Sequence, residues 1–124
     1  MPETEIRLYR ETDETTPLLD WLDDLPDKAK DKCIAVISRL ADFGNQLRRT
    51  DCDYLTDGIY ELRARVGNVN YRILYGFAGK QIVLLSHGCT KKKKVPAKEI
   101  NRAIDNMKAY KQDPDSHTYS ENIL

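Results

Sequence analysis

The order of apolar and polar residues predicts one strand followed by two helices in the first third of the chain. Residues 4–10 alternate in polarity, which is the pattern of a half-buried strand. Behind Pro17, a residue suited to the first turn of a helix, leucines recur at helical spacing. A second apolar stripe of helical period runs from Pro26 to Phe43, and Gly44 supplies a stop. Because almost nothing joins the two helices, we expect a helical hairpin laid on a sheet.

Three closely spaced strands and one more helix are predicted in the second half. Strands are expected at 58–65, 69–77 and 80–87, and the short glycine-containing links between them indicate an antiparallel meander. Residues 45–57 lack a sustained period, so we interpret them as a connection. Pro96 then begins a helical pattern with one apolar face.

A length of 124 residues suits one compact domain, which we place at residues 1–111. Residues 112–124 are polar and interrupted by proline, and we expect a disordered tail there. The predicted fold class is α+β. It consists of a small, antiparallel-rich sheet made of the N-terminal strand and the three-strand meander, backed by the two-helix hairpin, with a C-terminal helix.

Charge is segregated along the chain although its formal sum is zero. Residues 1–57 carry 8 Lys and Arg against 14 Asp and Glu, whereas residues 58–124 carry 12 against 6. Residues 58–111 hold 12 basic and 3 acidic side chains, a balance of +9. A segment with this excess attracts polyanions or an acidic partner.

Several protein classes find no support in the sequence. No stretch approaches the apolar length of a membrane span, and the acidic N-terminus has no apolar leader, so we expect a cytoplasmic protein without a membrane partner. The three cysteines are widely spaced without a CxxC pair, which disfavours a disulfide framework and a zinc site. Motifs for nucleotides or metals are lacking, and we therefore expect neither a metal nor another cofactor.

Strand alternation predicts where basic side chains gather. Arg63 and Arg65 share one face of their strand, and Arg72 projects from the next strand. If the apolar faces of both strands cover the helices, the three arginines gather on an exposed face. The loop after His87 would bring Lys91 to Lys94 to the same end of the sheet. Guanidinium groups suit phosphate because their rigid fork donates two hydrogen bonds at once.

Plainer interpretations stay open for these residues. Arg63 and Glu61 could form an ordinary surface ion pair, and a run of lysines taken alone is usually solvated. His87, which ends an apolar strand, is more often structural, and Tyr71 is chiefly a core residue that would stack on a base only if it faced the arginines. Arg72 lies in an apolar strand, where a half-buried arginine needs an anionic partner.

Three segments, "DGIYELRAR", "NYRILY" and "SHGCTKKKKVPAKEI", resemble in this order the HigB-like, phage-derived branch of the RelE/ParE superfamily of toxins. The resemblance covers roughly residues 4–111. It implies a RelE-like fold and the toxin of a type II toxin-antitoxin system. The implied activity is that of a metal-independent endoribonuclease, an mRNA interferase, that cuts ribosome-bound mRNA and inhibits translation. The implied partners are that mRNA and a cognate antitoxin, a HigA-like helix-turn-helix protein.

By position, Arg63, Arg65 and Arg72 match the basic strand residues of that family, and Lys91 and Lys92 match its basic loop. The role of each residue is our hypothesis. Arg72 and Lys92 would stabilise the transition state, and Lys91 or His87 would transfer protons. Val95 stands where the family often has threonine, and neither tyrosine nor histidine follows the basic loop, so the general base stays open. The residues expected to bind RNA are Arg63, Arg65, Tyr71, Lys91, Lys93 and Lys94.

Two other functions remain alternatives, because a fold does not fix a function. One is a ParE-like inhibitor of DNA gyrase. The other is a non-catalytic module that only binds an antitoxin.

Overall fold

The computed structural model describes residues 4–79, 81–91 and 94–119, and only the main chain of Lys91. The described residues form three α-helices, one 3-10 turn and a single six-stranded sheet. The helices are α1 (Pro17–Asp23), α2 (Asp27–Phe43) and α3 (Ala97–Gln112), and the 3-10 turn η1 (Gly44–Gln46) follows α2. The strands are β1 (Glu5–Tyr9), β2 (Cys52–Thr56), β3 (Ile59–Val66), β4 (Val69–Phe77), β5 (Ile82–Lys91) and β6 (Thr118–Tyr119).

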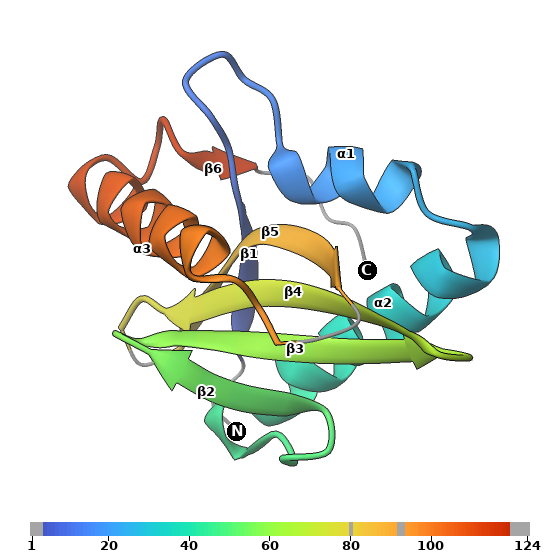
Figure 1. Ribbon diagram of the computed structural model, residues 1–124. Coiled ribbons are helices and arrows are strands. Elements are labelled where there is room, and N and C mark those ends of the chain that lie inside the picture. Colours follow the sequence, from blue (N-terminus) through green and yellow to red (C-terminus); the bar gives the residue numbers. More distant parts are fainter. Residues whose placement is uncertain (1–3, 80, 92–93, 120–124) are drawn as a thin grey trace.

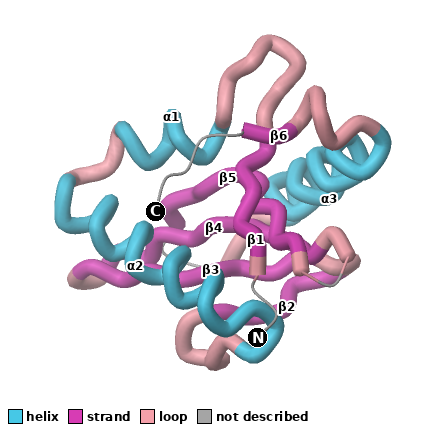
Figure 2. The backbone as a smooth tube through the Cα atoms, turned by 180° about the vertical axis from the view of Figure 1, so that it is seen from behind, coloured by secondary structure: helices cyan, strands magenta, loops and turns pink. Residues whose placement is uncertain are grey.

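The sheet is mixed, and helices cover both of its faces. Its strand order is β2-β3-β4-β5-β1-β6, with β1 parallel to β5 and every other neighbouring pair antiparallel. Figure 1 shows α3 on the near face. The view from behind in Figure 2 shows α2 on the opposite face, where α1 also packs. The predicted α+β class, with an N-terminal helix pair and a C-terminal helix, is confirmed.

The main core lies between the sheet and the first two helices. The apolar stripe of α2 packs there, and Cys33, Ile37 and Leu40 have no exposed surface. The predicted stripe ends one turn early, because Phe43 is 57% exposed. Gly44 stops the helix at a φ of 56°, a backbone conformation that favours glycine, and its N–H donates to the Leu40 carbonyl.

The other face of the sheet is also covered, contrary to the expectation of an exposed face. Ile59, Leu74 and Cys89 are buried there together with Ala103 of α3 and with Val95, which precedes that helix. The physical reason is that α3 is amphipathic and must bury its own apolar side against the sheet. Only part of this face is therefore open to a ligand.

Two strand boundaries differ from the predictions. Part of the expected connection 45–57 forms β2, which a tight turn at Asp57 and Gly58 joins to β3, with φ values of 51° and 81°. The third strand of the meander continues past His87 to Lys91 because it pairs with β4 as far as Asn70. A bulge at Ser86, between the pairs formed by His87 and Leu85, shifts its register.

The expectation of a disordered tail is wrong for residues 113–119. α3 continues to Gln112, and Thr118 and Tyr119 then form β6 against β1. The His117 ring stacks on Tyr9 with centroids 5.3 Å apart. Without β6, this edge of β1 would carry unpaired main-chain N–H and carbonyl groups, and such groups favour the addition of a strand.

Candidate nucleic-acid interface

Strand pairing brings the predicted arginines to one end of β3 and β4. Arg63 lies opposite Arg72, and two residues further Arg65 lies opposite Asn70. Asn70 also pairs with Lys91 at the end of β5. Because side chains alternate along a strand, these positions share the sheet face on which α3 packs. This end of the face therefore carries three arginines.

Arg72 is buried beside a carboxylate of the same chain. The Arg72 side chain is 11% exposed and that of Glu61 is 7% exposed, and Nε lies 3.3 Å from Oε2. Neither atom has an aligned hydrogen bond, so the contact is an ion pair held by charge alone. The prediction that Arg72 lies on an exposed face is therefore wrong. Sequence reasoning paired Glu61 with Arg63 and missed the cross-strand partner.

Arg63 and Arg65 differ in how firmly they are held. The Arg63 Nη2 donates to the main-chain oxygens of Arg49 and, at 3.3 Å, Cys52, and its Nη1 lies 3.8 Å from an Asp53 carboxylate oxygen. The exposed Arg65 donates from Nε to the carbonyl of the turn after β3, at 2.9 Å. Its terminal nitrogens have no hydrogen bond to the described residues. The terminal nitrogens of Arg65 are therefore more available than those of Arg63 to bind an anion.

His87 lies in a buried polar network and is only 1% exposed. Its Nδ1 is 2.8 Å from the Ser86 hydroxyl, which also accepts from the Asn106 amide at 2.9 Å, and its Nε2 is 3.2 Å from Glu99. The bulge turns Ser86 and His87 toward α3 together. Burial lowers the pKa of His87, and the charge of Arg102 lowers it further against the opposing effect of Glu99. The ring is therefore neutral at pH 7.

The remaining predicted residues are spread out. Tyr71 is buried in the main core, where its ring meets Trp21 edge-on at 6.3 Å, so it faces away from the arginines. Lys94 is exposed just before α3. Lys92 and Lys93 lie outside the described residues, and so does the Lys91 side chain.

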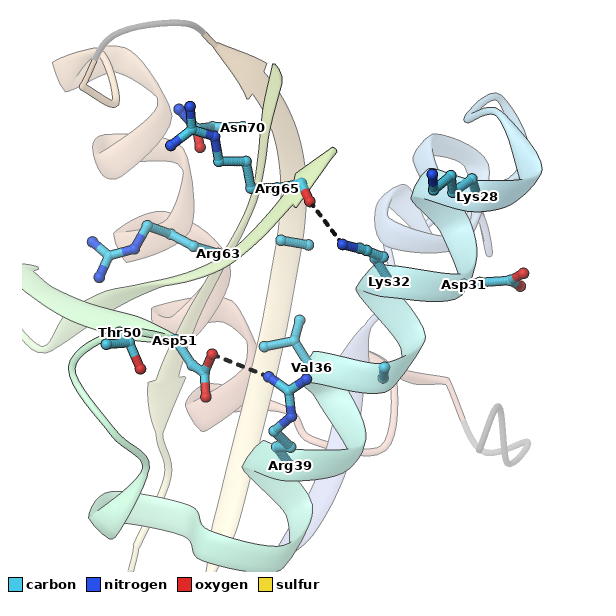
Figure 3. A pocket seen from close by; sticks show the side chains of 12 residues that line it. Lys28, Asp31, Lys32, Val36, Arg39, Thr50, Asp51, Arg63, Arg65 and Asn70 are labelled. Carbon is cyan, nitrogen blue, oxygen red and sulfur yellow. Dashed lines mark hydrogen bonds and ion pairs between the residues drawn. The ribbon is translucent and has the colours of Figure 1, made fainter. Parts of the chain in front are cut away.

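A groove of about 580 Å³ opens between α2 and the end of β3 (Figure 3). Lys28, Lys32 and Arg39 line its α2 wall. The Lys32 ammonium donates to the Arg65 carbonyl at 3.3 Å, and Arg39 is 3.0 Å from Asp51. Sequence reasoning missed this groove, although the spacing of the three basic residues places them on one side of a helix.

The structure also bears on metals and membranes. No three or more His, Cys, Asp or Glu side chains gather among the described residues in a way that could hold a metal ion. None of the helices in the described part of the chain has the length and apolar character to cross a membrane.

The sequence of this chain matches a known protein family. Residues 20–108 match the family described as phage derived protein Gp49-like, from α1 to within α3. This range contains all of the strands that carry the arginines. No curated protein matches the chain. Because the match covers well over half of its length, the chain belongs to the family of phage-derived Gp49-like proteins.

Proposed function

We propose that this Gp49-like protein is a HigB-like toxin of a type II toxin-antitoxin pair, an endoribonuclease that cuts ribosome-bound mRNA without a metal. The observation that carries the proposal is the gathering of Arg63, Arg72 and Arg65, with the main chain of Lys91, on one end of a sheet face. Membership of the phage-derived family and the motif resemblance support the same activity. An antitoxin of the helix-turn-helix class would neutralise it.

The chemistry requires charge stabilisation and proton transfer. In this reaction the RNA 2′-hydroxyl attacks the neighbouring phosphate, and negative charge develops on the phosphorane oxygens. The Arg72 guanidinium, with Lys92, would stabilise that charge. Arg65 and Arg63 would hold the flanking phosphates, as bidentate donors to oxygen.

The proton acceptor has three candidates. Lys91 and His87 follow from the sequence, but the His87 ring is enclosed by Ser86 and Glu99. The third candidate is Glu61, which lies 3.3 Å from Arg72 on the face where the phosphate would bind. A carboxylate so close to the phosphate-binding arginine could take the 2′-hydroxyl proton, provided that substrate binding opens the ion pair.

Cleavage of mRNA on purified ribosomes tests the proposal. New 5′ ends within codons are mapped by primer extension for the unaltered protein, Arg72→Ala, Arg72→Lys and the control Arg48→Ala. We expect Arg72→Ala to lower the cleavage rate about 100-fold or more, the usual effect of removing one transition-state donor. Arg48 is 75% exposed and outside the arginine face, so its variant should cleave normally. Unchanged cleavage by a folded Arg72→Ala would remove Arg72 from the mechanism.

A gyrase supercoiling assay on the same preparations separates the main alternative. Inhibition of supercoiling without any new mRNA ends would indicate a ParE-like activity. Absence of both effects, with full binding of an antitoxin, would indicate a non-catalytic module.

A further inference from the structure

The outer edge of β3 is only half covered by β2. Strand pairing stops at Leu62, and one more hydrogen bond joins the Arg63 N–H to the Asp51 carbonyl at 2.8 Å. Beyond it, no described strand pairs with the outer edge of residues 64–66. Main-chain groups that point to one edge recur every second residue, so the N–H and carbonyl of Arg65 point outward as well. Lys32 already donates to that carbonyl.

This open edge forms one wall of the groove between β3 and α2 (Figure 3). The lining residues include five basic side chains and two acidic ones, so the groove is positive although the N-terminal half of the chain is acidic. Ala35, Val36 and Ala64 add apolar surface, and the lining contains no aromatic side chain. The basic residues are Lys28, Lys32, Arg39, Arg63 and Arg65, and the acidic ones are Asp31 and Asp51.

We infer that this groove binds an acidic segment of a partner protein, which adds to β3 as an extended strand. An unpaired strand edge recognises a peptide main chain through alternating donors and acceptors. The apolar surface suits the side chains that point into the groove. Lys28 and Lys32 have no described carboxylate partner within ion-pair distance, so they can bind carboxylates of the partner segment. Arg39 is less suited to this, because Asp51 already neutralises it.

RNA is the less suitable occupant of this groove. A nucleic-acid strand has no peptide groups to match the Arg65 N–H and carbonyl. Single-stranded binding also relies on aromatic side chains on which bases stack, and none lines the groove.

A strand bound here would lie beside the candidate nucleic-acid interface. Arg65 is two positions from Arg63 on β3 and opposite Asn70, so a bound acidic segment would place negative charge next to the arginine face. Occupying the groove would then oppose RNA binding. This regulatory consequence rests on the proposed function, whereas the binding itself does not.

Titration of the ¹⁵N-labelled protein with a short capped peptide of alternating Glu and Val tests the inference. We expect amide shifts at residues 64–66 and along the groove side of α2, and slower exchange of the Arg65 amide. A peptide with proline at its central valine should bind more weakly because it loses a donor. The titration needs no nuclease activity, so its result is independent of the cleavage assay.

Four variants locate the binding site. Lys28→Glu combined with Lys32→Glu should weaken the peptide at least about tenfold, since two reversed charge contacts amount to roughly 1.4 kcal/mol. Lys98→Glu, which reverses a charge at an exposed position of α3 instead, should change affinity less than about twofold. Arg65→Pro, which removes the outward N–H, should weaken binding more than Arg65→Ala.

Two results would overturn the inference. One is a peptide titration that leaves residues 64–66 unshifted. The other is an RNA oligonucleotide of equal charge that, at a lower concentration than the peptide, shifts the amides of α2 around Lys28 and Lys32, which lie away from the arginine face, because this would reassign the groove to nucleic acid.

Discussion

The ion pair between Glu61 and Arg72 predicts how substitutions at the two positions combine in their effect on the free energy of unfolding. Removing one partner, as in Glu61→Leu or Arg72→Met, leaves the other charge buried without compensation. Such a change usually costs about 3–5 kcal/mol of unfolding free energy. Replacing both residues at once removes the buried charge, so the double variant should be far more stable than the sum of the two single losses implies.

The magnitude follows from the distance and the burial. At 3.3 Å and an effective dielectric constant of about 20, the Coulomb attraction is about 5 kcal/mol. Desolvation of both ions offsets much of this attraction. Because Arg72 Nε and Glu61 Oε2 have no aligned hydrogen bond, no hydrogen-bond energy compensates for the desolvation of these two atoms. We therefore expect a coupling energy of about 2–3 kcal/mol between the two sites, within the range found for residues in contact.

Urea unfolding of the four proteins measures this coupling. A matched control is the pair of Lys30 and Asp23, which has a nearly equal distance of 3.2 Å but side chains that are 42% and 69% exposed. Its coupling should be below about 1 kcal/mol. If the two single losses at Glu61 and Arg72 simply added, or if each stayed below about 1 kcal/mol, the buried ion pair would not exist in solution. Under conditions where the double variant is folded, it should also lack cleavage, which would separate catalysis from folding.

Three further outcomes are expected. Because burial lowers the pKa of His87 in the folded protein, the unfolded chain binds a proton first, and stability should fall as pH drops below about 6.5. Urea midpoints measured from pH 7 to 5 should show this fall, and His87→Phe should flatten it. An unchanged pH dependence in the variant would contradict this role of His87. Gly88→Ala should lower the melting temperature because its new methyl group would overlap the Trp21 indole, and Trp21→Leu should recover part of the loss; equal melting temperatures would refute this packing. Burial raises the pKa of the Cys33 thiol to about 12, so a thiol reagent should modify it only as fast as the protein opens, and rapid labelling of the native state would contradict its burial.

Local patterns in the sequence were sufficient for most of the fold. The helices are specified by signals that act within a few residues. These are the period of the apolar residues in α2 and α3, Pro17 at the start of α1 and Gly44 at the end of α2. The strand β2 was missed because its period is weak over five residues. The available signal was the Asp57-Gly58 dipeptide before β3, because Asp-Gly is typical of tight hairpin turns. In the structure both residues adopt a positive φ.

The candidate site was harder to predict because it depends on pairing between strands. The alternation of β3 and β4 gives the face of each arginine but not its neighbours across the strands. Only the register shows that Glu61 and Arg72 meet diagonally, and only the position of α3 shows that this face is covered. The sequence alone therefore suggested an open phosphate grip where the structure has a closed ion pair.

The parallel placement of β1 has a consequence for biosynthesis. Leu8, near the start of the chain, pairs with Leu85 on one side and with Tyr119 on the other. While the chain is being made, β1 must wait for most of the protein to leave the ribosome before either neighbour is available. Sheets that depend on such distant contacts form slowly. A chain that stops before β5 would leave β1 without its parallel neighbour, and one that stops before β6 would leave the outer edge of β1 without a described partner strand.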